Sequence, residues 1–240
     1  MIVSHKHRFI FLKTRKTAGT SIEIALSEHC GPKDTISPND PADEELRKEL
    51  GFRGPQNRWV APWKLGFTGL LGLIQRKEWA FHYNHCIAEL VKRRVGTSKF
   101  ESYTRFCVVR NPWDRAVSMY WWNRNRTDGH AIDESIDFPT YVREAELKLL
   151  TDKDIFQIDG EAVVDHFVKF EELQEGLDSV MDDIGLPHLT LPRAKGGTRK
   201  TKQHYSLLYD DETMMIIANI CAWEIKRFGY EFDDQRSADN

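Results

Sequence analysis

The stretch FIFLKTRKTAGTSIE, residues 9–23, begins as an apolar run and then turns into a cationic loop rich in small residues. It predicts a short buried strand over Phe9–Leu12 and a helix over Thr20–Ser27. The loop between them, Lys13–Gly19, carries three cationic side chains and one glycine. A strand, a tight loop and a helix form the arrangement in which backbone N–H groups cradle an anion. The sequence therefore predicts a phosphate or sulfate site at this loop.

The loop departs from the Walker A signature of ATPases. That signature reads GxxxxGK[ST] and has its lysine after the second glycine. Here Lys16 precedes Gly19, the only glycine of the loop, so a strict ATPase loop is excluded. The hydroxyls of Thr20 and Ser21 are suited to donate to phosphate oxygens. A capped helix beside a solvated basic loop is the alternative that the loop alone leaves open.

A second apolar strand, within RFCVVRNP at residues 105–112, ends at Arg110. In many P-loop NTPases the corresponding strand ends in an aspartate that holds Mg²⁺. An arginine fork is suited instead to bidentate binding of a phosphate without a metal. Ser118 follows eight residues later and could share that phosphate only if the turn folds back. The alternative is a structural ion pair between Arg110 and Asp114.

Strands alternate with helices along the rest of the chain, which favours an α/β fold. We expect a single domain over residues 1–240, with a largely parallel central sheet flanked by helices. We expect residues 31–80 to form a variable insertion and residues 193–205 to form a basic loop. The remaining expected elements are a hairpin turning at Asp159-Gly160 and helices over Asp43–Leu50, His85–Val95, Trp113–Asn125, Phe138–Leu150, Glu171–Ile184 and Asp211–Phe228.

Composition narrows the class of protein. The net charge of −3 points to neither a nucleic-acid coat nor an anionic membrane surface. The four cysteines are scattered without a CxxC pair, which fits a reducing compartment and neither a zinc site nor a disulfide framework. No apolar run approaches the roughly 20 residues that span a bilayer. We therefore expect a cytoplasmic protein, or the soluble portion of a longer chain.

Two motifs together carry a resemblance to a known family. KTAGTS at residues 16–21 and VVRNPWDRAVS at residues 108–118 resemble the sulfotransferases that use 3′-phosphoadenosine 5′-phosphosulfate (PAPS), nearest to the carbohydrate-type families. Weaker similarities are VKFEEL at residues 168–173 and the segment from KQHYSLLYDDET to FGYEF at residues 202–232. Many relatives have proline at the position of Arg15, so we expect a less rigid loop entry here.

The resemblance implies a PAPS site. Arg110 and Ser118 would hold the 3′-phosphate, which distinguishes PAPS from ATP. The resemblance also makes residues 193–205 a lid loop over the nucleotide, in which Arg199, Lys200 or Lys202 would reach a phosphate, although a solvated loop is the alternative. In MYWWNR, the side chains of Trp121 and Trp122 could stack on a sugar or the adenine, and we expect one of them to pack in the core. The residues that would hold the 5′-phosphosulfate are Lys16, Thr17, Ala18, Gly19, Thr20 and Ser21.

Sulfuryl transfer to an alcohol needs a base for the hydroxyl proton and a cation for the leaving phosphate oxygen. Lys16 is suited to the second task. Within EWAFHYNHCIAEL, residues 78–90, the candidate bases are His85, then His82, then Glu78. Relatives carry a histidine just before such a helix, which favours His85. Two alternatives stay open for His82 and His85. They could be structural histidines, or they could bind a metal through their i, i+3 spacing.

The resemblance thus implies an enzyme that moves SO₃ from PAPS to a hydroxyl and leaves adenosine 3′,5′-bisphosphate, without a metal. A sugar hydroxyl is the favoured acceptor, so the expected partner is a glycan or glycoconjugate, with no nucleic acid and no membrane span. Two rival functions stay open. One is a nucleotide-dependent kinase of P-loop architecture, and the other is a non-catalytic binder of phosphorylated or sulfated ligands.

Overall fold

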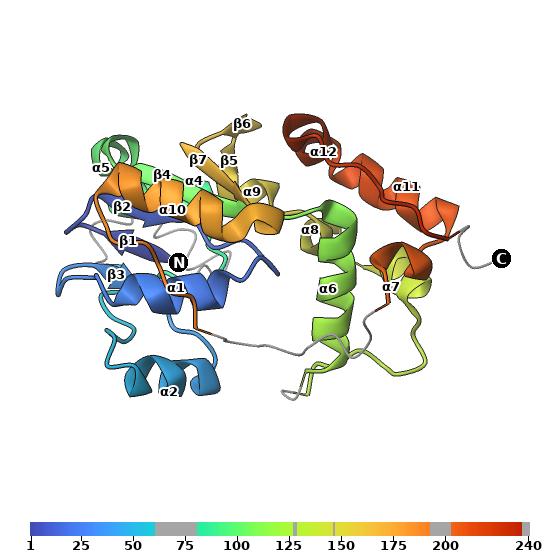
Figure 1. Cartoon of the computed structure of the whole chain (residues 1–240), viewed down its shortest axis with the longest axis horizontal. Helices are drawn as coiled ribbons and strands as arrows, with labels where there is room; N and C mark the ends of the chain where they lie inside the picture. The colour runs from blue at the N-terminus through green and yellow to red at the C-terminus, as the bar shows by residue number, and fades with distance from the viewer. Residues whose placement is uncertain (61–80, 127–128, 146, 193–202, 237–240) are drawn as a thin grey trace, which may run out of the picture. The chain divides into compact units, whose positions relative to one another are not determined.

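The computed structural model describes residues 1–60, 81–126, 129–145, 147–192 and 203–236 (Figure 1). The chain divides into two compact units, and each is described here by itself. The sheet unit comprises Met1–Thr14, Ala18–Val109 and Lys153–Ala194. The helical unit comprises Arg15–Thr17, Arg110–Asp152 and Lys195–Asn240. The expectation of one domain over residues 1–240 stays a prediction.

The sheet unit contains a five-stranded mixed sheet in the order β3-β1-β2-β4-β7. Strands β2, β4 and β7 run parallel, with Phe11 opposite Phe106 and Val108 opposite Val168. Strand β1 pairs antiparallel with both β2 and β3. The strands are β1 (Ile2–Ser4), β2 (Phe9–Phe11), β3 (Thr35–Ile36), β4 (Thr104–Val109) and β7 (His166–Lys169). The expected α/β class is confirmed, and the parallel part of the sheet holds the two strands predicted from sequence.

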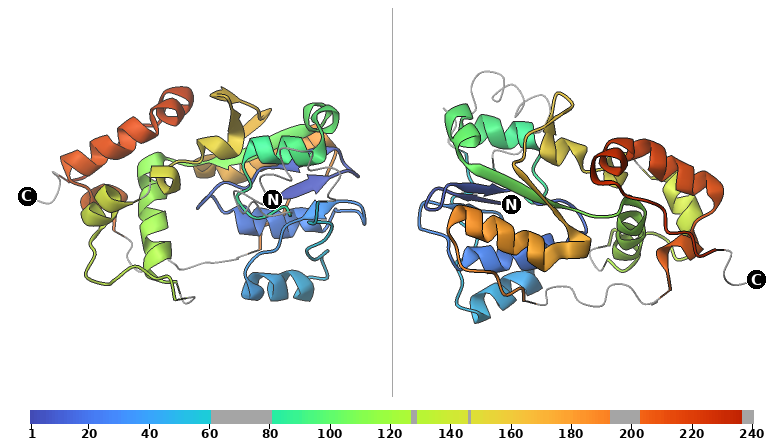
Figure 2. Two further views of the ribbon diagram at one scale, coloured as in Figure 1. Left: turned by 180° about the vertical axis from the view of Figure 1, so that it is seen from behind. Right: turned by 45° about the horizontal axis from the view of Figure 1, so that its top comes forward.

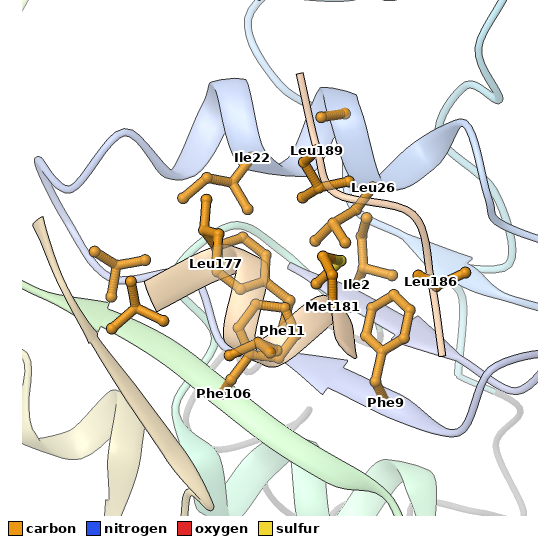
Figure 3. Packing of buried hydrophobic residues seen from close by; sticks show 14 of the residues in the cluster. Ile2, Phe9, Phe11, Ile22, Leu26, Phe106, Leu177, Met181, Leu186 and Leu189 are labelled. Carbon is orange, nitrogen blue, oxygen red and sulfur yellow. The ribbon is translucent and has the colours of Figure 1, made fainter. Parts of the chain in front are cut away.

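The sheet is covered on both sides, which explains why β2 is apolar throughout and β4 is apolar from Phe106 to Val109. Helices α1 (Gly19–Ser27) and α10 (Leu173–Ile184) pack on one side, and α4 (Ala88–Val95) and α5 (Thr97–Ser102) lie on the other (Figure 2). Figure 3 shows the core on the first side, where aromatic rings of β2 and β4 meet aliphatic side chains of both helices. Its labelled members include Phe9, Phe11, Ile22, Leu26, Phe106, Leu177 and Met181.

The remaining elements of the sheet unit are short. A hairpin joins β5 (Gln157–Ile158) to β6 (Glu161–Ala162), and both turn residues, Asp159 and Gly160, have positive φ. The predicted turn is therefore confirmed, as is the end of α10 at Gly185, which adopts a left-handed conformation. The other elements are α2 (Pro41–Glu49), α9 (Lys153–Phe156) and the 3₁₀ turn η1 (Phe170–Glu172).

The helical unit is built around α6 (Pro112–Arg124). The side chain of Asn111 caps this helix by accepting from the N–H groups of Trp113 and Asp114, and Pro112 is its first residue, one position before the predicted start at Trp113. Buried aromatic side chains pack behind α6, with Phe138 edge-on to Tyr120 at 5.5 Å and to Tyr209 at 4.7 Å between ring centroids. This packing holds α6, the helix that follows Arg110 in the sequence, in place.

Two long helices expected in this unit are interrupted. The predicted helix over Phe138–Leu150 is α7 (Phe138–Glu144) and α8 (Leu147–Leu150), because Ala145 is extended. The predicted C-terminal helix is α11 (Asp211–Ile220) and α12 (Ala222–Phe228), separated by Cys221. Cys221 contacts the Leu150 carbonyl at 3.3 Å and receives a hydrogen bond from Arg115 at 3.5 Å, so tertiary contacts accompany the break. The predicted ends are correct, with an Asp210 capping box and a left-handed Gly229.

Within the described ranges, no helix combines the length and the apolar composition that crossing a membrane requires.

Candidate functional site

The anion loop, residues 13–19, has an unusual backbone. Lys16 and Ala18 both have φ of 60°, the left-handed region that non-glycine residues seldom adopt. Each such residue costs on the order of 1 kcal/mol, and such strain clusters at functional sites. Helix α1 starts at Gly19, with Ala18 at its N-cap position and no capping side chain. The first-turn N–H groups of a helix have no partner within the helix, so an anion could satisfy them here.

Position 19 requires a glycine because a neighbouring side chain passes close to it, and not because of its own backbone angles. A Cβ at this position would lie 2.8 Å from Cγ and 3.3 Å from Cε of Lys13. The Lys13 side chain therefore runs directly across the start of α1, and only glycine leaves room for it. The sequence identified Lys13 as one of three loop cations, but gave no indication of this path.

The Lys13 ammonium is buried and lies 2.8 Å from Glu23 Oε2. The Met1 amino group donates to the same oxygen at 2.9 Å, and Arg47 lies 3.5 Å from the other. Burial alone would raise the pKa of Glu23, but the Met1, Lys13 and Arg47 charges outweigh it and lower the pKa to about 2. Because burial also lowers the pKa of the Met1 amino group to about 5, Lys13 and Arg47 carry the charge facing Glu23 at neutral pH.

This cluster escaped the sequence prediction, although one signal was available. Glu23 is a lone carboxylate in the apolar run SIEIAL of a helix that packs on the sheet. A charged residue on such a helix is rarely fully buried unless it is paired. Its cationic partner Lys13 stands ten residues earlier in the sequence, and the contact between the two is known only from the fold.

His85, the first candidate base, contacts the first residue of the anion loop. Its Nδ1 lies 2.9 Å from the backbone oxygen of Lys13, and its φ is 58°. Asn84, immediately before it, lies 3.4 Å from the Lys13 ammonium. The helix that follows begins at Ala88 and not at His85, and Ile87 is 37% exposed. Ile87 therefore does not anchor this helix against the sheet, although its apolar spacing with Leu90 and Val91 predicts that it would.

Leu90 and Val91, on the apolar face of α4, are both buried. His82, the second candidate base, is also buried, and its backbone N–H donates to the carbonyl of Arg58 at 2.8 Å. Its burial agrees better with a structural histidine than with a base that meets a substrate. Glu78, the third candidate, lies outside the described residues.

In the helical unit, Arg110 reaches the anion loop. Its Nη1 donates to the backbone oxygen of Lys16 at 2.8 Å. Its Nε and Nη2 both donate to Asp114 Oδ2, at 2.9 and 2.6 Å. The ion pair considered as the alternative role of Arg110 is thus present. Ser118 lies one turn beyond Asp114 on the same face of α6, and it is half-buried. Because Asp114 holds the Arg110 guanidinium, this guanidinium lies on the helix face that also carries Ser118.

Arg15 is anchored rather than solvated. Its backbone N–H donates to Asp152 Oδ2 at 2.9 Å, and its guanidinium contacts Oδ1 at 2.6 Å. Asp152 is buried and also receives a hydrogen bond from Arg115 at 2.7 Å. The position that is proline in many relatives therefore gains an anchor that proline could not provide, because proline has no N–H to donate.

The two tryptophans of α6 differ in their surroundings. The ring of Trp121 lies 5.2 Å from that of Tyr120, edge to face. The ring of Trp122 has two cations near it, with the Lys16 ammonium 5.5 Å and the Arg126 guanidinium 4.7 Å from its centroid. Trp122 is therefore the one that contacts a candidate site residue.

Other expectations fall outside what the structure describes. Arg199, Lys200 and Lys202 lie in residues 193–202, beyond the described ranges, as does most of the predicted lid loop. In the described part of the chain, no group of three or more His, Cys, Asp or Glu side chains is arranged to hold a metal ion.

Comparison with known proteins extends these observations. A model of the sulfotransferase family matches residues 1–136, a range that contains the anion loop, His85, Arg110 and Ser118. An uncharacterized protein of Archaeoglobus fulgidus is 28% identical over 111 residues, which cover 42% of this chain and 82% of that protein. No solved structure gives a significant match.

Proposed function

This chain belongs to the sulfotransferase family, and we propose that it moves a sulfuryl group from PAPS to an acceptor hydroxyl, leaving adenosine 3′,5′-bisphosphate. The observation that carries the proposal is the family match over residues 1–136, which includes both KTAGTS and VVRNPWDRAVS. The strained loop backbone and the uncapped start of α1 support an anion site at the first motif.

We assign the 5′-phosphosulfate to the loop, whose donors suit its charge. The backbone N–H groups of the first turn of α1 and the hydroxyls of Thr20 and Ser21 would donate to its oxygens. Lys16 would meet the negative charge that grows on the leaving phosphate oxygen. Thr17, Ala18 and Gly19 complete the segment that the resemblance assigns to this group.

Arg110 and Ser118 would bind the 3′-phosphate. Asp114 orients the guanidinium of Arg110 through two hydrogen bonds. Charge-assisted hydrogen bonds of an arginine fork to a phosphate are stronger than neutral ones. Arg110 would thus serve twice, holding the Lys16 carbonyl and binding the phosphate.

His85 would act as the general base that takes the hydroxyl proton. It contacts the anion loop through Lys13 and is half-buried, whereas His82 is buried. The proton then goes to the imidazole as the acceptor oxygen attacks sulfur and the bond from sulfur to the phosphate oxygen breaks. We propose a sugar hydroxyl as the acceptor, and this rests on the resemblance to the carbohydrate-type families.

The test compares nucleotides by thermal stabilisation. With a chelator present, adenosine 3′,5′-bisphosphate is expected to raise Tm, whereas 5′-AMP raises it much less. In a separate arm without the chelator, ATP with Mg²⁺ is also expected to raise Tm much less. If ATP with Mg²⁺ raises Tm and the bisphosphate does not, the kinase alternative is favoured. Transfer of labelled sulfate from PAPS to a panel of glycans is the second measurement. A protein that binds the bisphosphate but transfers to none of the glycans, and does not hydrolyse PAPS, would be the non-catalytic binder.

A further inference from the structure

The two ends of Lys13 contact different parts of the site: its side chain contacts the buried carboxylate of α1, and its backbone contacts the candidate base. Its side chain crosses Gly19 and ends 2.8 Å from Glu23 Oε2. Its backbone oxygen lies 2.9 Å from Nδ1 of His85. All of these groups belong to the sheet unit, and the family resemblance assigns no role to Lys13 or Glu23.

The contact to His85 determines which ring nitrogen carries the proton. A carbonyl oxygen can only accept a hydrogen bond, so Nδ1 must be the donor. A neutral imidazole has one protonated and one basic nitrogen, and its basic lone pair is then on Nε2. The Lys13 carbonyl therefore selects the tautomer in which Nε2 is the atom able to take a proton.

The side chain of Lys13 fixes the segment that bears His85. Its ammonium donates to Asn39 Oδ1 and lies 3.4 Å from Asn84 Oδ1. Asn84 is held further, since it accepts from Ser37 at 2.8 Å and donates to the Pro38 carbonyl at 2.6 Å. The next residue, His85, has φ of 58°, a conformation that surrounding contacts must maintain.

We propose that Lys13 is a positioning residue for sulfuryl transfer, which holds His85 in the tautomer with a basic Nε2 and fixes it to the entrance of the anion loop. This inference rests on the proposed role of His85 as the base. Glu23 and Asn84 support Lys13 in this role. None of the three needs to contact PAPS or the acceptor.

A purely structural ion pair is the competing explanation, and Arg47 provides a matched control. Among the described residues, Lys13 and Arg47 are the two side-chain cations that pair with Glu23, and both are buried. Either Lys13→Met or Arg47→Met leaves Glu23 with one cationic side chain, so similar losses of stability are expected. Only Lys13→Met removes the contacts to Asn39 and Asn84.

The readout is the tautomer of His85, measured by two-bond ¹H–¹⁵N NMR on protein labelled at histidine, with the signal assigned through His85→Gln. The wild type is expected to show the Nδ1–H form. Lys13→Met is expected to give a mixture of tautomers and to lower kcat roughly 10- to 100-fold, because misplacing a catalytic group by about 1 Å costs of that order. The affinity for adenosine 3′,5′-bisphosphate and the KM for PAPS should change little.

If Lys13→Met does not fold, Asn84→Ala tests the proposal instead. The Asn84→Ala variant removes the contact between Asn84 and the Lys13 ammonium and leaves the ion pair of Lys13 with Glu23 intact. An Nε2–H form in the wild type would overturn the proposal. So would equal losses of kcat in Lys13→Met and Arg47→Met, or an unchanged tautomer in both Lys13→Met and Asn84→Ala. The NMR result does not depend on turnover, so a chain that transfers no sulfate would defeat the proposed function and leave the tautomer assignment separately testable.

Discussion

The guanidinium of Arg110 donates to the backbone oxygen of Lys16 at 2.8 Å, although the two residues are 94 positions apart. The residue proposed to bind the 3′-phosphate therefore also holds the residue proposed to assist the leaving group. Lys16 has a left-handed backbone conformation, and a hydrogen bond at its carbonyl helps to maintain it. The loss of Arg110 should then affect both binding and catalysis.

Arg110→Ala is expected to weaken the binding of adenosine 3′,5′-bisphosphate about 10- to 100-fold, because charged hydrogen bonds are worth roughly 1.5–3 kcal/mol. Binding of 5′-AMP, which lacks the 3′-phosphate, should change far less. Isothermal titration calorimetry with both nucleotides measures the difference. Asp114→Asn is the matched control, since it keeps Arg110 and removes only the charge of its partner. Equal weakening of both nucleotides would contradict the 3′-phosphate assignment.

Lys16→Met is expected to lower kcat roughly 100- to 1,000-fold, the range seen when one group that stabilises a developing oxyanion is removed. The affinity for adenosine 3′,5′-bisphosphate should fall much less, because the charge matters most in the transition state. Alanine should be as inactive as methionine, and Lys16→Arg should retain part of the rate. A loss confined to affinity would make Lys16 a ground-state anchor. Single-turnover transfer and calorimetry separate the two results.

Local sequence patterns predicted much of the fold, because the features concerned are local. The apolar runs of β2 and β4, the helix predicted over Trp113–Asn125 and the turn at Asp159-Gly160 each depend on neighbouring residues alone. The breaks at Ala145 and Cys221 were missed. At Cys221, contacts with residues distant in the sequence accompany the break, and no local signal indicated them.

In the candidate site too, local features could be predicted from the sequence and long-range contacts could not. The motif of the anion loop is contiguous, and its resemblance to the family could be recognised from sequence. The contact of His85 with Lys13 joins residues 72 positions apart, and spacing alone does not predict it. Glu23 could have been found as a lone charge in an apolar helix, but its cationic partners are known only from the fold.

Glu23 predicts a specific loss of stability in acid. Its folded-state pKa of about 2 is below the unfolded value, so its stabilisation is fully present above about pH 4.5. It is lost as the pH falls from there through about 2, and the pKa difference corresponds to roughly 3 kcal/mol. Urea unfolding between pH 6 and 2 measures this dependence. Glu23→Gln should be less stable at neutral pH and should lose less stability over the same interval. Parallel curves for the two proteins would contradict the assignment.

Gly19→Ala should destabilise the protein by about 1–3 kcal/mol, the usual cost of overpacking. The added methyl group would meet Lys13 Cγ at 2.8 Å, and Lys13 cannot move away without lengthening its contact with Glu23. Gly54→Ala is the matched control, because a Cβ there meets nothing within 4 Å. Chemical denaturation of both variants measures the difference. If Gly19→Ala is no less stable than Gly54→Ala, the Lys13 side chain does not follow the path described.

The two candidate histidines differ in ways that separate their variants. His85 is half-buried, and its Nδ1 contacts the anion loop at Lys13. His82 is buried, and its backbone pairs with that of Arg58. Removing a buried side chain mainly lowers stability, because it leaves a cavity. Removing a general base mainly lowers turnover.

His85→Ala is therefore expected to lower kcat at least about 100-fold, within the 10²- to 10⁴-fold range of general bases, and to leave adenosine 3′,5′-bisphosphate binding nearly intact. His82→Ala should lower Tm and retain most of kcat in the fraction that is folded. In the wild type, kcat should rise with pH across the range where histidines ordinarily titrate, around 6.5, because the base must be neutral to accept a proton. That rise should disappear in His85→Ala. Greater damage to kcat from His82→Ala would exchange the two roles, and wild-type turnover in both variants would direct the search to a carboxylate, with Glu78 the first to test.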